Sequence, residues 1–208
     1  MQIFRTFVQL QKLVDEILPC LDKFQILPSR ISFLTSPGLQ ADQDSIDLLP
    51  SDVPDAHFPV QIQGDGNYFP RTLSLLAFRD QEKHVEMRVR ITVESVLNFK
   101  KYTSPAYLAR GSSDNGDELL RAMIMYTSTP FHSATEAFKK HSRAFKSELL
   151  LIKAPSKECG MWQMFVAANI LHARVTSVFP VNRTVDVRNL CTCTVLAEVE
   201  LREPRLIM

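Results

Sequence analysis

Residues 65–68, Asp-Gly-Asn-Tyr, are the stretch whose residue types and spacing come nearest to a catalytic site. Asp-Gly-Asn is a sharp turn composition, and the residues after it predict a helix from about Phe69 to Phe78. A helix N-terminus offers free backbone N–H groups and a positive dipole end, which suit a thiolate nucleophile and the oxyanion formed on attack. Tyr68 stands where a cysteine would make chemical sense. On pattern alone, a structural turn with a helix cap explains this stretch better, because Asp-Gly-Asn is common in turns.

Two blocks of the sequence resemble the OTU (ovarian tumour) family of cysteine deubiquitinases. In the first, GDGNYFPRTLSLLAF, the residues Asp65, Gly66, Asn67 and Arg71 match the family's nucleophile segment, and Tyr68 occupies the position of its cysteine. The second, GMWQMFVAANILHARVTSVFP, is similar to the family's Trp-containing turn, apolar helix and following strand. The two blocks come in the family's order.

Within the family, the stretches PGLQADQDSIDLLPSDVPDAHFPVQIQGDGNYF and MWQMFVAANILHARVTSVFPVNR are similar to the divergent vertnin-like branch. This resemblance covers about residues 20–190. It implies an α+β fold of the OTU-like cysteine-protease type, with a small mixed or antiparallel sheet flanked by helices. It also implies a non-catalytic branch whose members resemble nuclear, DNA-associated regulators.

The chemistry that remains in the chain predicts a degenerate site made of Asp65, Gly66, Asn67 and Tyr68, with no catalytic residue intact. A phenol has a pKa of about 10, and its ring would fill the place of a substrate carbonyl. The resemblance places the family's general-base histidine on a strand near the C-terminus, yet residues 173–208 contain no histidine. Asp65, which in the family supports the oxyanion site, is then left without a reaction. The alternative is a domain truncated before the C-terminal strand that carries this histidine.

A relocated nucleophile is the second alternative. Cys159 precedes a predicted helix, where the pKa of a thiol can be lowered, and His132 or His141 could act as its partner. A buried structural thiol explains Cys159 better, because nothing in the spacing requires a dyad. The four cysteines form no CxxC pair, so we expect neither a metal site nor a cofactor.

The amino-acid composition limits the cellular compartments and the classes of partner that are expected for this chain. The 208 residues include 24 basic and 23 acidic side chains, for a formal net charge of +1. This balance predicts that nucleic acid does not bind through this domain alone. No apolar run approaches the roughly 20 residues that span a bilayer. We therefore expect no membrane association and an intracellular protein, either nuclear or cytoplasmic.

Hydrophobic periodicity and loop composition separate an N-terminal amphipathic helix (1–24) from an irregular connecting segment (25–60). The resemblance implies that residues 61–208 form the OTU-like domain. Inside the domain, hydrophobic periodicity predicts one helix over about 81–102, helices that begin near Asp117 and at Ser133, and a buried apolar helix over about 159–173. Strands are expected at 174–180, 184–188 and 191–201.

The expected function is that of a catalytically inactive OTU-like domain. It would act as a protein-binding module, with ubiquitin or polyubiquitin as the candidate partner, or as a scaffold in a vertnin-type regulator. The alternative is an active OTU-type deubiquitinating cysteine protease. A third hypothesis, a DNA- or transposon-associated accessory domain, has poor support from the near-neutral charge.

Overall fold

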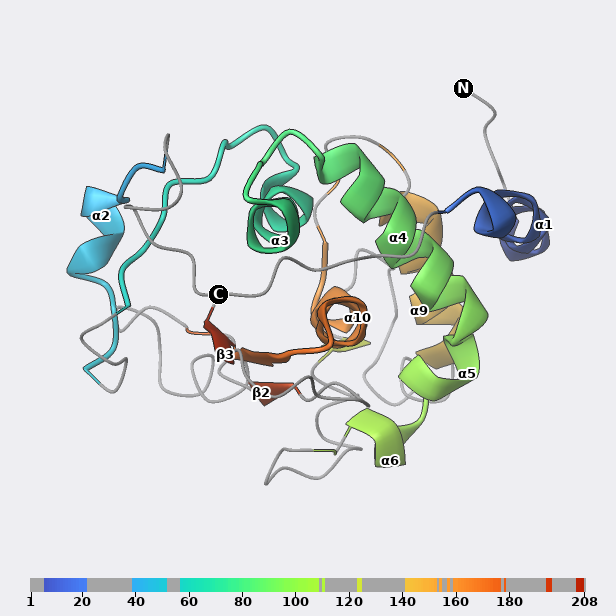
Figure 1. Ribbon diagram of the computed structural model, residues 1–208. Helices are drawn as coiled ribbons and strands as arrows, with labels where there is room; N and C mark the ends of the chain where they lie inside the picture. Colours follow the sequence, from blue (N-terminus) through green and yellow to red (C-terminus); the bar gives the residue numbers. More distant parts are fainter. Residues whose placement is uncertain are drawn as a thin grey trace.

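The structure is a computed structural model that describes residues 6–21, 39–51, 57–108, 110, 123–124, 141–152, 154, 157, 159–176, 178, 194–195 and 205–207. Most of these residues are helical, and a short sheet lies beside the helices (Figure 1). None of the described helices combines the length and the apolar composition that a membrane crossing requires.

Helix α4 (His84–Leu97) is the element around which the other helices assemble. It contacts α1 (Phe7–Ile17), α3 (Tyr68–Phe78), α9 (His141–Ile152) and α10 (Trp162–Leu171). Its buried apolar side chains include Met87, Ile91 and Val96. Helix α10 lies between α4 and the sheet, as Figure 1 shows, so the core has helices on one side of α10 and strands on the other.

The N-terminal helix α1 begins at a capping box, in which the Thr6 side chain accepts from the backbone N–H of Gln9 and the Gln9 side chain accepts from that of Thr6. Leu10 and Val14 from the predicted apolar stripe are buried. The helix gives way to a 3₁₀ turn, η1 (Leu18–Cys20), at Pro19. Proline cannot donate the backbone hydrogen bond that would continue the α-helix, which explains this end.

The single helix predicted over 81–102 is wrong, because the structure divides it. Helix α4 ends at Leu97, Asn98 leaves helical geometry at φ −105° and ψ 27°, and α5 (Phe99–Tyr102) follows. Asparagine competes poorly for helix interiors, which favours a break at this position. A further short helix, α6 (Pro105–Leu108), comes after α5.

Helix α10 is buried on nearly every side, which confirms its prediction as an all-round apolar helix. Trp162 packs on Phe145 of α9 with ring centroids 5.1 Å apart. Its indole Nε1 donates to the backbone oxygen of Tyr102 at 3.0 Å. Asn169 of the same helix donates to the Tyr102 hydroxyl at 2.8 Å, so the core holds a satisfied polar network beside its aromatic cluster.

The described strands form a three-stranded sheet in the order β2-β1-β3. Strand β1 (Arg174–Thr176) pairs antiparallel with β2 (Thr194–Val195) and parallel with β3 (Arg205–Ile207). Val175 of β1 is fully buried. The starts of the helices predicted from Asp117 and Ser133 and the strand predicted at 184–188 lie outside the described residues.

Within residues 25–60, the described parts include one helical turn, α2 (Gln43–Ile46), and an isolated antiparallel bridge between Ala41 and Val60. The bridge brings residues 40–42 beside residues 59–61, directly upstream of the predicted site. The segment that leads into α3 is therefore held in an extended conformation by pairing.

Candidate functional site

The turn before α3 is built from Asp65, Gly66 and Asn67. Gly66 has φ 78°, in the left-handed region that glycine adopts without steric cost. The backbone N–H of Asn67 donates to Oδ1 of Asp65 at 2.9 Å, which closes the turn through a side chain. Helix α3 then starts at Tyr68, within one residue of the predicted Phe69.

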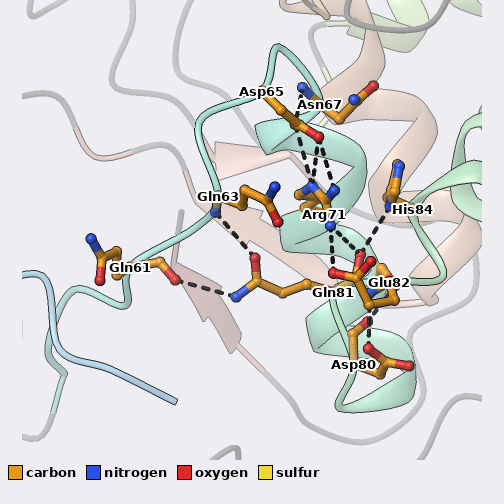
Figure 2. A network of polar contacts seen from close by, with 10 residues as sticks. Gln61, Gln63, Asp65, Asn67, Arg71, Asp80, Gln81, Glu82 and His84 are labelled. Atoms are coloured by element: carbon orange, nitrogen blue, oxygen red, sulfur yellow. Dashed lines mark hydrogen bonds and ion pairs between the residues drawn. The ribbon is translucent and has the colours of Figure 1, made fainter. Parts of the chain in front are cut away.

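Arg71, one turn into α3, fixes this turn from below (Figure 2). Its Nη2 atom lies 2.8 Å from Oδ2 of Asp65, and its Nε atom lies 3.3 and 3.2 Å from the two carboxylate oxygens. Its Nη1 atom donates to the backbone oxygen of Gln81 at 3.2 Å and to Oε1 of Glu82 at 2.9 Å. One buried guanidinium thus joins the turn to the loop between α3 and α4.

The electrostatics of this cluster favour the ionised form of Asp65. Hydrogen bonds from Arg71 above all, and from Asn67, hold the pKa of the Asp65 carboxyl well below its usual range. The same contact with Asp65 raises the pKa of Arg71. The resemblance assigned Asp65 to the support of an oxyanion; in the structure its carboxylate orders the turn.

Asn67 is the residue that precedes α3, but its side chain does not cap the helix. Its Oδ1 atom accepts a hydrogen bond from Nη2 of Arg88 in α4 at 2.8 Å. The same guanidinium donates to the backbone oxygens of Ile152 at 2.6 Å and Lys157 at 3.0 Å. Arg88 therefore ties the turn to the end of α9 and to the chain before α10.

Tyr68 is the first residue of α3, and its side chain is 42% exposed. An aromatic ring therefore stands at the helix start where the OTU-type nucleophile is expected. Its backbone oxygen accepts from the Thr72 hydroxyl at 2.8 Å. This position can present an aromatic surface to a partner, but a phenol at this place does not supply a thiolate.

Cys159 lies close to the same cluster. Burial raises the pKa of its thiol to about 12, Arg88 partly opposes this rise and Glu148 adds to it. A thiol with so high a pKa stays protonated near neutral pH, which is unfavourable for a nucleophile. The two charged groups that act on it are an arginine and a glutamate, neither of which is the histidine of a protease dyad.

The histidines of the described helices lie at the ends of three different helices. His172 ends α10 in a left-handed conformation with φ 47° and is exposed. His141 begins α9, and His84 begins α4, where its Nδ1 atom lies 3.2 Å from the backbone oxygen of Gln81. His132, one of the two partners considered for Cys159, lies outside the described residues. The described part of the chain contains no group of three metal-ligating side chains.

The structure thus brings Asp65, Gly66, Asn67 and Tyr68 together as one turn. It adds contact residues that the sequence analysis missed, namely Arg88, Gln81 and Glu82. Arg88 carried a signal, since it lies on the same helix face as the apolar Ile91. Gln81 carried none, because an isolated glutamine in a loop has no distinguishing pattern.

The sequence was compared with models of known protein families. The family model described as Vertnin, OTU domain, matches residues 59–208, a span that includes the turn, Arg71, Arg88 and Cys159. The protein class is therefore the OTU domain, with the OTU-like fold that this implies. Within that class, the chain belongs to the vertnin OTU domain family. No match was found among curated proteins or among solved structures.

Proposed function

We propose that this chain is a catalytically inactive OTU-like domain that binds a protein partner, with ubiquitin or polyubiquitin as the first candidate. It would act inside the cell, in the nucleus or cytoplasm, as a binding or scaffolding module of a vertnin-type regulator. The proposal includes the fold: an OTU-like cysteine-protease fold whose small mixed sheet is flanked by helices.

One observation carries the proposal: the first residue of α3 is the exposed Tyr68, at the position where the family's nucleophile belongs. Its surroundings add support. Asp65, Arg71 and Arg88 are engaged in ordering the turn, and an ordered turn with an exposed aromatic side chain is suited to recognition. The raised pKa of Cys159 argues against the alternative of an active protease that uses this thiol.

Two assays on the intact chain test the absence of catalysis. A ubiquitin propargylamide probe should leave no covalent adduct, and a ubiquitin–coumarin reporter should not be hydrolysed. Multiple turnovers of the reporter would overturn the proposal and favour the active protease. A covalent adduct on a Tyr68→Cys variant would support the view that the C-terminus of ubiquitin still reaches the start of α3.

A third assay tests the partner. Titration with ubiquitin and with chains of defined linkage should give saturable binding that Tyr68→Ala weakens about tenfold, because exposed tyrosines often anchor interfaces. Val85→Ala is the matched control, since Val85 is an exposed apolar residue in the first turn of α4. Binding that is absent for every chain type, or equal for wild type and Tyr68→Ala, would contradict ubiquitin recognition at this site.

A further inference from the structure

The extended segment at residues 59–63 has two edges, and one of them is already paired. The N–H of Gln61 donates to the backbone oxygen of Gln40 at 2.8 Å. The carboxamide of Gln81 continues this edge, because it donates to the backbone oxygen of Gln61 at 3.3 Å and accepts from the N–H of Gln63 at 3.2 Å (Figure 2). A further strand therefore has no free backbone groups to pair with on this edge.

The opposite edge of the same segment is formed by Val60 and Ile62. The bridge between Ala41 and Val60 lies between the two hydrogen bonds of its ladder, so the N–H and C=O of Val60 point away from residues 40–42. Those of Ile62, two positions further along the extended chain, point the same way. Among the hydrogen bonds that the described residues make, none involves a backbone group of Val60 or Ile62. Both residues thus present unpaired donors and acceptors at the spacing of a strand edge.

The side chains along this edge are uncharged and partly exposed. Phe58 is 40% exposed, and Val60 and Ile62 are half-buried. Because these three residues alternate with Pro59 and Gln61, their side chains share one face of the extended segment. An apolar face beside unpaired backbone groups is complementary to another extended segment that carries uncharged apolar residues on the same face.

We propose that the edge at Val60 and Ile62 binds an extended, uncharged segment of a protein partner by strand addition. Main-chain hydrogen bonds supply the affinity, and alternating apolar side chains packed beside Phe58 supply the preference. A second copy of this chain is the competing occupant, but a stable dimer buries about 1,200–2,000 Å², far more than so short an edge provides. The proposal goes beyond ubiquitin recognition at Tyr68 and does not rest on it.

The first test is amide hydrogen exchange, measured by NMR on the intact chain with and without the hexapeptide STVTVS, acetylated and amidated at its ends. In the free protein the amides of Val60 and Ile62 should exchange fast, whereas that of Gln61 is protected by its bond to Gln40. The peptide should slow exchange at Val60 and Ile62 by about tenfold and leave Gln61 unchanged. The same peptide with every backbone nitrogen methylated should give no protection, because it cannot donate main-chain hydrogen bonds.

Two results of this test would overturn the proposal. Equal protection of Val60, Ile62 and Gln61 in the free protein would mean that the edge is already paired. Protection that rises with protein concentration in the absence of peptide would identify a second copy of the chain as the occupant.

Peptide composition and variants of the edge complete the test. The peptides STKTKS and STETES place charges at the apolar positions and should bind about fivefold more weakly than STVTVS, since those charges would be desolvated without a partner. Val60→Pro removes one edge N–H and should weaken binding about tenfold, whereas Val60→Ile keeps it and is the matched control. Equal binding of the three peptides, or of the two variants, would contradict the proposal. An unchanged amide spectrum outside residues 57–63 establishes that Val60→Pro is folded.

Discussion

The Nη2 atom of Arg88 lies 2.8 Å from Oδ1 of Asn67, so a buried guanidinium of α4 holds the residue that precedes α3. Arg88 is 6% exposed, and burial lowers its pKa. Its guanidinium donates to three neutral oxygen acceptors, two of which are backbone carbonyls. The shape of the turn before α3 thus depends on a residue that lies outside residues 65–71.

Arg88→Met should lower the free energy of unfolding by about 2–4 kcal/mol, because it removes the donor of two buried hydrogen bonds and of one part-buried hydrogen bond. Arg88→Lys should lower the free energy of unfolding by less, because an ammonium keeps the charge and can still donate hydrogen bonds, although it lacks the planar donor fork. Urea unfolding followed by circular dichroism measures both. Equal losses for the two variants, or a loss below about 0.5 kcal/mol for Arg88→Met, would contradict this role of the guanidinium.

Asp65→Asn should make the stability of the protein less dependent on acid pH. The folded-state pKa of Asp65 is depressed, chiefly by Arg71, so its ionised form stabilises the fold fully above the unfolded pKa of about 4. This contribution is lost as the pH falls from there toward the folded-state pKa. The thermal midpoint of wild type should therefore exceed that of the variant at neutral pH, and the gap should narrow below about pH 4.

Arg71→Met is the companion variant in that experiment, since it removes the main cause of the lowered pKa of Asp65. Its pH profile should resemble that of Asp65→Asn. If the difference in thermal midpoint between wild type and Asp65→Asn stays constant from neutral to acid pH, the Asp65–Arg71 ion pair is not the source of that difference.

Gly66→Ala should destabilise the protein by about 1–2 kcal/mol, because the residue has φ 78° and a Cβ is strained in that region. Gly64→Ala provides a matched control two residues earlier. A Cβ at Gly64 would meet no atom within 4 Å, and we expect a change within about 0.5 kcal/mol. Chemical denaturation of both variants gives the comparison, and similar losses would show that the left-handed turn is not the cause.

Cys159 should react with iodoacetamide far more slowly than Cys20 in the folded protein. Cys20 is exposed, whereas burial raises the pKa of the Cys159 thiol to about 12 and leaves little thiolate at neutral pH. Brief alkylation followed by peptide mass spectrometry reports each site separately. Preferential labelling of Cys159 would instead indicate an activated thiol and would revive the alternative of a relocated nucleophile.

The sequence predicted the local parts of this molecule well. The turn composition located the start of α3 within one residue, and the continuous apolar character of α10 indicated its burial. Both features depend on short-range patterns, which periodicity and turn chemistry capture. The break at Asn98 was missed because an apolar period continues across it, and only the backbone geometry shows the interruption.

The partners of the site could not be predicted in the same way. Arg88 and Gln81 act on the turn and on the segment before it from 21 and 18–20 positions away in the chain. Such contacts depend on how α3 and α4 fold back on one another, and a single sequence carries no direct record of that packing. The residues of the turn are neighbours in the sequence, whereas the residues that contact them from α4 and from the loop before it are distant in the sequence.

The contacts of Arg88 also have a consequence for the order of folding. Its carbonyl partners Ile152 and Lys157 lie 64 and 69 positions along the chain, so these bonds close long loops. The full set of Arg88 contacts, including the one with Asn67 in the turn before α3, can be complete only after α9 and the segment before α10 have docked. We expect it to mature late in refolding, after the helices themselves have formed.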